Sequence, residues 1–149
     1  DSVVLDVVYI TKPTKGSISS GAATLTVQDT TGYANSDPVM VAGAGALGAD
    51  LFTTVSSISG SVLTLAANAQ TTVNSVQVGK LSTPTSPTCK VRKPDGTTAT
   101  VTLSLVATGR YQGTFDPTLA GDHTYRGEGT GAAKGAAEKR FVVRAKVVI

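Results

Sequence analysis

The chain has 149 residues, of which 40% are hydrophobic and 15% charged, and its formal net charge at pH 7 is +3. This length allows one ordinary domain or two small ones, and the apolar content excludes a wholly disordered chain. The single cysteine, Cys89, excludes an internal disulfide scaffold. We expect Cys89 to be a packed strand residue; an intermolecular disulfide within an assembly is the alternative.

The first part of the chain has the residue pattern of β-strands. The apolar run Val3–Ile10 is interrupted by Asp6 and is far shorter than the roughly 18–20 residues that span a bilayer. No basic segment precedes it, so we do not expect a signal peptide. From Ala23 onward, apolar and polar residues alternate with the strand period of two. The alternating segments are residues 23–27, 39–41, 51–58, 61–65 and 73–78, separated by turn-forming residues that include a hairpin turn at 59–60.

A Pro-, Ser- and Thr-rich stretch at residues 81–88 is the best linker candidate, because prolines interrupt a sheet interior. After it, strands are expected again, with a turn at Lys93–Gly96. The expected strands are residues 88–93, 98–106, 110–115, 123–127 and 140–149. We therefore predict an all-β chain of two modules: a barrel- or sandwich-like module at 1–83 and a β-sandwich at 84–149.

The spacing Gly43-x-Gly45-x-x-Gly48 matches a dinucleotide-binding fingerprint, but that motif requires a helix at its end. The chain continues instead with the β-branched segment 51–55, so we predict a flexible Gly/Ala loop, GAGALG. One His and one Cys cannot supply a zinc site, and no calcium loop or nucleophile elbow occurs. His123 is expected to be a strand residue. We predict no catalytic, cofactor-binding or metal-ligating residues, and no cofactor.

Charge is distributed unevenly between the two predicted modules. Residues 1–83 carry three Lys/Arg and five Asp/Glu, a net charge of −2, whereas residues 84–149 carry ten and five, a net charge of +5. The basic residues gather in two clusters, which are Lys90, Arg92 and Lys93, and Lys139, Arg140, Arg144 and Lys146. One interpretation is that these residues form a strip that faces nucleic-acid phosphates. We expect instead that they contact another protein or lie on solvated strand faces.

The first module resembles a β-module of tailed-phage virion proteins, best known from tail spikes. Residues 38–55 read PVMVAGAGALGADLFTTV, followed by ISG at 58–60, VLTL at 62–65 and AQTTV at 69–73. In tail spikes this module often precedes a β-helix, which this chain lacks. The resemblance therefore implies a virion protein but carries over no sugar-cleaving activity.

The second module resembles the small Ig-like domains of phage structural proteins. The residues that carry this resemblance are VRKPDGT at 91–97, GRY at 109–111, FDPT at 115–118, AGDHTYR at 120–126 and EKRFVV at 138–143. Tyr125 occupies the place of an Ig tyrosine corner, with His123 two residues before it. The resemblance implies an inter-sheet core of Leu103, Tyr111, Phe115, Tyr125, Phe141 and Val143.

Together these features predict a non-enzymatic structural component of a tailed-phage virion, located in the particle. Capsid decoration or a head–tail neck or collar position is expected, with docking to capsid, portal, neck or tail proteins. We expect a homo-oligomer or a place in a symmetric assembly, and neither nucleic acid nor membrane as partner. The apolar ends, residues 3–10 and 142–149, are expected to pair with each other or to augment a neighbour's sheet.

The alternative function is a receptor- or carbohydrate-binding tail or fibre accessory module, and a bacterial surface adhesin ranks third. Sugar binding calls for exposed aromatic residues on loops. Only Tyr33 fits that requirement in the sequence, so the alternative ranks below assembly.

Overall fold

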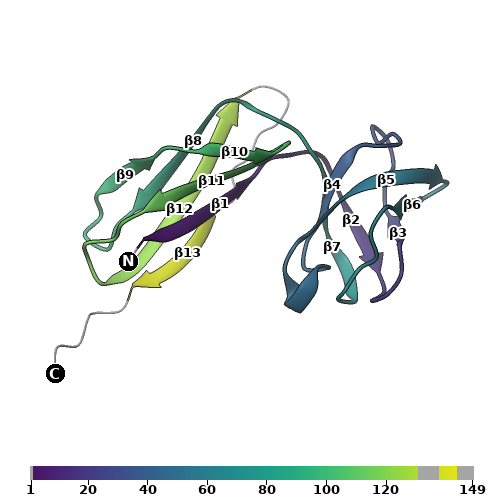
Figure 1. Cartoon of the computed structure of the whole chain (residues 1–149), viewed down its shortest axis with the longest axis horizontal. Helices are drawn as coiled ribbons and strands as arrows, with labels where there is room; N and C mark the ends of the chain where they lie inside the picture. The colour runs from purple at the N-terminus through teal and green to yellow at the C-terminus, as the bar shows by residue number, and fades with distance from the viewer. Residues whose placement is uncertain (1, 131–137, 144–149) are drawn as a thin grey trace. The chain divides into compact units, whose positions relative to one another are not determined.

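A computed structural model describes residues 2–130 and 138–143 of the chain. The chain forms two compact units, one of residues Ile10–Ser82 and the other of Asp1–Tyr9 together with Thr83–Ile149. Apart from the three-residue 3-10 turn η1 (Ala46–Gly48), every regular element of the described part is a β-strand. The predicted all-β fold class is confirmed (Figure 1).

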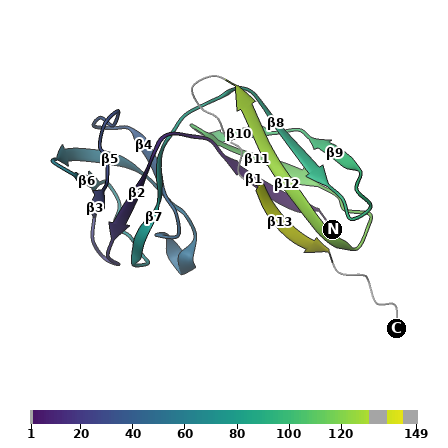
Figure 2. The same ribbon diagram turned by 180° about the vertical axis from the view of Figure 1, so that it is seen from behind.

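The unit of residues 10–82 is a closed barrel of antiparallel strands in the order β2-β3-β6-β5-β4-β7. Both views show these six strands curling into one group (Figures 1 and 2). The strands alternate as a closed barrel requires: in β3, Leu25 and Val27 are buried, whereas Thr24 and Thr26 are exposed. The barrel strands are β2 (Ile10–Ile18), β3 (Thr24–Val27), β4 (Pro38–Val41), β5 (Leu51–Ser59), β6 (Val62–Leu65) and β7 (Val73–Leu81).

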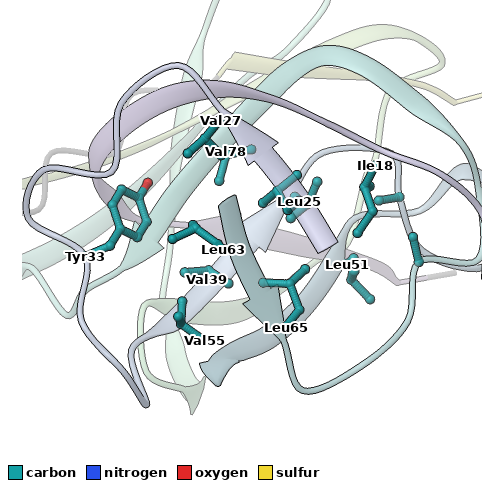
Figure 3. Packing of buried hydrophobic residues seen from close by; sticks show 13 residues of the cluster. Ile18, Leu25, Val27, Tyr33, Val39, Leu51, Val55, Leu63, Leu65 and Val78 are labelled. Atoms are coloured by element: carbon teal, nitrogen blue, oxygen red, sulfur yellow. The ribbon is translucent and has the colours of Figure 1, made fainter. Parts of the chain in front are cut away.

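Aliphatic side chains fill the barrel (Figure 3). The buried residues include Ile18, Leu25, Val27, Val39, Val41, Leu51, Val55, Leu63, Leu65 and Val78. Gly16 also faces this core, because a Cβ at that position would lie 2.9 Å from Cγ2 of Val78. The predicted hairpin at Ser59-Gly60 is confirmed, since Ser59 of β5 pairs with Val62 of β6.

The other unit is a two-sheet sandwich. One sheet has the strand order β1-β11-β10 and the other β13-β12-β8-β9. Its strands are β1 (Val3–Val8), β8 (Thr85–Arg92), β9 (Thr98–Val101), β10 (Ser104–Ala107), β11 (Arg110–Phe115), β12 (Gly121–Thr130) and β13 (Glu138–Val143). Both sheets contribute to one core, which consists of Leu5, Val7, Tyr9, Cys89, Val91, Val101, Tyr111, Phe115 and Tyr125.

The predicted sandwich core is confirmed in part. Tyr111, Phe115 and Tyr125 are buried, and Leu103 packs against them half-buried. Phe141 and Val143 lie in β13, and their side chains fall outside the described ones. The predicted core omitted the contribution of β1.

The predicted module boundary was wrong at the N-terminal end. Residues 1–9 belong to the sandwich rather than to the first module, because β1 pairs along its length with β11, from Val3 opposite Phe115 to Val8 opposite Arg110. β1 pairs with β11 along one of its edges, and the predicted pairing of residues 3–10 with residues 142–149 stays a prediction. Residues 144–149 lie outside the described residues.

Two smaller predictions also need correction. The linker expected over 81–88 is only residues 82–84, since β7 runs to Leu81 and β8 begins at Thr85. The single strand expected over 98–106 is divided into β9 and β10, which belong to different sheets. The chain crosses between the sheets at Thr102 and Leu103, next to Gly113, where an added Cβ would lie 2.8 Å from the Thr102 carbonyl oxygen.

The sandwich departs in one strand from the constant-type Ig order, in which the second strand lies beside the first and fifth. Here the second strand of the unit, β8, pairs with β12 and β9 in the other sheet. Tyr125, at the place of the Ig tyrosine corner, donates its hydroxyl over 3.3 Å to the carbonyl of Asp6 on β1. This hydrogen bond ties the sheet that contains β12 to the N-terminal strand.

Candidate functional site

The loop of residues 43–50 between β4 and β5, which we term the Leu47 loop, combines an exposed apolar side chain with an unusual backbone. Leu47 is fully exposed. Its backbone is left-handed, with φ 55° and ψ 30°, a conformation that residues other than Gly, Asn and Asp adopt rarely. An exposed large apolar side chain thus stands on a strained backbone.

The base of the loop is held by a hydrogen bond within it and by two hydrogen bonds from residues 70 and 71. The Gly45 amide donates to the Ala49 carbonyl over 2.7 Å, and the Gln70 amide donates to the Ala44 carbonyl over 2.8 Å. The Thr71 hydroxyl donates to the Gly45 carbonyl over 2.7 Å. Ala44 is completely buried in the barrel core. The expectation of a flexible loop therefore does not fit a segment so densely bonded.

The first part of the loop leaves no room for a side chain at Gly45. A Cβ there would lie 2.8 Å from the carbonyl oxygen of Ala49 and 2.9 Å from that of Asp50. Gly43 and Gly48 have φ values of +72° and +78°, which glycine adopts at little cost. The Asp50 carboxylate accepts a hydrogen bond from the Gly43 amide over 3.1 Å. Each glycine of the GxGxxG spacing thus has a conformational or steric reason, and none involves a helix or a nucleotide.

Such a loop can act as a contact point for another protein. Because hydrogen bonds hold the backbone at the base of the loop, ordering that backbone on binding costs little, and more of the energy of burying Leu47 appears as affinity. Strained, well-determined residues cluster at functional sites. Sequence reasoning missed Leu47; the available signal was one large apolar residue in a loop of Gly and Ala.

The basic clusters lie partly within the described residues. Lys90 and Arg92 are exposed on β8, and Lys90 lies opposite Arg126 of β12. Arg126 forms an ion pair with Glu128, with Nε and Oε1 3.6 Å apart. Lys139 and Arg140 are in β13, without described side chains, while Arg144 and Lys146 lie outside the described residues. The interpretation of the basic residues as a strip that faces phosphates thus stays a prediction.

The observed boundary also changes the distribution of charge. Residues 10–82 carry three Lys and three Asp, a net charge of 0, and the remaining residues carry ten Lys/Arg and seven Asp/Glu, a net charge of +3. The acidic first module disappears because Asp1 and Asp6 belong to the sandwich. The two units therefore do not carry opposite net charges, and docking to different partners cannot be explained by such charges.

Tyr33, the residue that supported sugar binding, was wrongly expected to be exposed. It is buried in the barrel core (Figure 3). Its hydroxyl donates to the Lys12 carbonyl over 2.7 Å, and burial raises the pKa of Tyr33 to about 12. A ring in this position cannot stack on a sugar.

Cys89 and His123 are interior residues of the sandwich. Cys89 is completely buried, and burial raises the pKa of its thiol. His123 is a fully buried residue of β12, as expected for a strand position, with Nδ1 3.1 Å from the Gly121 carbonyl oxygen and its ring at the edge of Phe115. Burial of Cys89 disfavours the intermolecular disulfide.

Within residues 2–130 and 138–143, no three His, Cys, Asp or Glu side chains gather as a metal site would require. That part of the chain also contains no helix with the length and apolar character to cross a membrane.

Comparison of the chain with protein-family models, curated proteins and solved structures gave no match.

Proposed function

We propose that the chain is a non-enzymatic structural component of a tailed-phage virion, a capsid decoration or head–tail neck protein that docks onto neighbouring virion proteins. The observation that carries this proposal is Leu47, fully exposed on a hydrogen-bonded loop. Burying such a side chain in a partner's pocket contributes roughly 1.5–3 kcal/mol. The strained backbone presents Leu47 in a fixed direction before the partner arrives.

The phage assignment rests on the sequence resemblance, and the loop lies inside the segment that carries it. Residues 43–48 are the GAGALG of that segment, and Thr71, whose hydroxyl binds the Gly45 carbonyl, lies in its closing AQTTV. The resembling residues therefore include those that shape the loop. This supports a shared docking element rather than a shared enzymatic one.

The test is quantitative mass spectrometry of density-gradient-purified particles from a culture that produces the chain. The proposal expects the chain at a fixed stoichiometry to the major capsid protein. In particles assembled with Leu47→Asn in place of the parent chain, incorporation should fall several-fold. The matched control is Thr54→Asn, an exposed position on β5 of the same barrel, which should leave incorporation unchanged.

Absence of the chain from purified particles would contradict the virion assignment. Unchanged incorporation of Leu47→Asn would contradict the role of the loop. The fold of each variant is checked by circular dichroism beforehand, so that a loss of incorporation cannot reflect unfolding.

A further inference from the structure

The outer face of the four-stranded sheet of the sandwich brings three basic side chains together. Lys90 and Arg92 are exposed on β8, two residues apart and therefore on one face of the sheet. Arg126 is exposed on β12 and lies directly opposite Lys90 in the register of the two strands. We term Lys90, Arg92 and Arg126 the cationic face.

Two of these cations lack acidic partners among the described residues. Lys90 and Arg92 form no ion pair there, and their neighbours on β9 are Thr100 and Thr98. Like charges directly opposite each other destabilise an antiparallel sheet, so the position of Lys90 opposite Arg126 lowers the stability of the sandwich. A bound anion would relieve this repulsion, because its negative charge would lie next to Lys90.

The acidic residues of the strands in this sheet are on β12 and β13. Asp122 and Glu128 are exposed on β12, where Glu128 forms the ion pair with Arg126, and Glu138 of β13 lies opposite Arg126. β8 and β9 contain neither Asp nor Glu, and Asp95 in the turn between them accepts hydrogen bonds within that turn. The half of the face formed by β8 and β9 is therefore cationic, without acidic side chains on its strands.

We propose that this half of the face, over β8 and β9, binds an acidic segment of another protein in an extended conformation. Alternate residues of an extended segment lie about 7 Å apart on one side, which is also the spacing of Lys90 and Arg92 along β8. Two alternate carboxylates of the partner would thus face these two cations, and a guanidinium group can bind a carboxylate through two parallel hydrogen bonds. The exposed Thr98 and Thr100 beside them supply hydroxyl groups for further hydrogen bonds.

The arrangement of this face favours a protein over a nucleic acid. Base stacking requires exposed rings, whereas His123 and Tyr125, the aromatic residues of β8, β9 and β12, are buried. A polyanion that reaches over β12 would also meet the carboxylates of Asp122 and Glu128, which repel phosphates. A protein segment can instead present acidic side chains to β8 and neutral or basic ones to β12.

The experiment measures the fluorescence anisotropy of a labelled peptide of alternating Glu and Thr, titrated with the full chain at low ionic strength. The parent chain should bind the peptide, and added salt should weaken the binding, because salt screens exposed charges. Lys90→Glu and Arg92→Glu should each weaken the binding by roughly tenfold or more, since each places a carboxylate opposite those of the peptide. The matched control is Lys15→Glu, which makes the same change of net charge at an exposed lysine of β2 in the barrel and should leave the affinity unchanged.

The stability of the sandwich gives a second readout that does not depend on the peptide. Because Lys90→Glu places opposite charges across β8 and β12 in place of like charges, it should raise the urea concentration at which these strands lose protection from hydrogen exchange. Binding should then fall although the fold becomes more stable, so that unfolding cannot explain the loss.

Absence of peptide binding by the parent chain would overturn the proposal. So would an equal loss of binding in Lys15→Glu and Lys90→Glu, which would indicate an effect of net charge alone. Tighter binding of single-stranded DNA of the same charge, removed by Lys90→Glu, would assign the face to nucleic acid instead, and a lower stability of Lys90→Glu would contradict the argument from like charges. The cationic face and the Leu47 loop belong to different units, and the peptide assay needs no virion, so this proposal and the proposed function can fail separately.

Discussion

Replacing Leu47 should separate stability from docking, because its side chain contributes nothing to the core and its backbone costs energy. A left-handed conformation costs an L-residue about 1–2 kcal/mol, and Asn tolerates that conformation better than Leu. Leu47 is fully exposed, so its removal forfeits no buried surface. We therefore expect Leu47→Asn to leave the barrel unchanged or to stabilise it by up to about 1 kcal/mol.

Leu47→Gly gives a second estimate of the same strain. Glycine removes the left-handed penalty fully, but its greater freedom in the unfolded chain costs about 0.5–1 kcal/mol. The two effects nearly cancel, so Leu47→Gly should fall between neutral and slightly stabilising. The contrast is Leu51→Ala, four residues further on, where the side chain is buried in the barrel core and the expected cost is about 2–5 kcal/mol.

These differences in the free energy of unfolding are measured by unfolding in urea. Hydrogen exchange with mass spectrometry monitors the unfolding on peptides of the barrel. Circular dichroism alone would mix the two units. Destabilisation by more than about 1 kcal/mol in both Leu47 variants would refute the reasoning, since only a packed side chain loses that much on truncation. Stability that is unchanged or higher, together with reduced incorporation into particles, would identify Leu47 as a residue maintained for docking.

Other predictions concern the sandwich and the buried tyrosines. The Cys89 thiol should react with a soluble disulfide reagent only after unfolding, because it is completely buried and its pKa is raised; rapid labelling of the native chain would contradict this. Burial raises the pKa of Tyr9 and Tyr33 to about 12 from the ordinary 10.0. The stability that depends on their protonated forms is therefore complete below pH 10.0 and is lost as the pH rises from 10.0 toward about 12. Chemical unfolding at stepped alkaline pH should show this loss, and Tyr9→Phe should reduce it; a flat profile would refute it. Deleting residues 1–9 should unfold the sandwich and leave the barrel folded, since burial of Leu5, Val7 and Tyr9 contributes about 1.5–3 kcal/mol each; hydrogen exchange that stays slow in β8 and β12 would contradict this.

Local patterns predicted much of this fold. The period of two located most barrel strands, such as β3 and β6, because a closed barrel buries alternate residues and exposes the others. The turns at Ser59-Gly60 and Lys93–Gly96 were predicted because each depends on a few adjacent residues; in the second, the Gly96 amide donates to the Lys93 carbonyl over 3.0 Å. Such features need no knowledge of distant partners.

The features that the sequence did not predict depend on distant partners. β1 reads as an apolar strand, but nothing local indicates that it pairs with β11, more than a hundred residues later. The conformation of Leu47 depends on Thr71 and on the buried Ala44 as well as on the glycines beside it. Tyr33 reads as a loop aromatic, and its burial follows only from the barrel that forms around it. The sequence therefore shows the GAGALG motif of the candidate site but does not predict the conformation of the loop.

The organisation of the chain follows from the place of β1. The barrel, Ile10–Ser82, is inserted between the first and second strands of the sandwich, β1 and β8. An insertion of this kind requires its two ends to be adjacent, and Ile10 does pair with Leu81 across β2 and β7. The barrel closes its own hydrogen-bonded ring and has its own core, so its folding needs nothing from the flanking segments. The sandwich core, in contrast, combines Leu5, Val7 and Tyr9 with residues after Thr83, so it can form only when both flanks are present. The folded barrel therefore brings β1 and β8 close together in space, because its adjacent ends shorten the effective loop between these two strands.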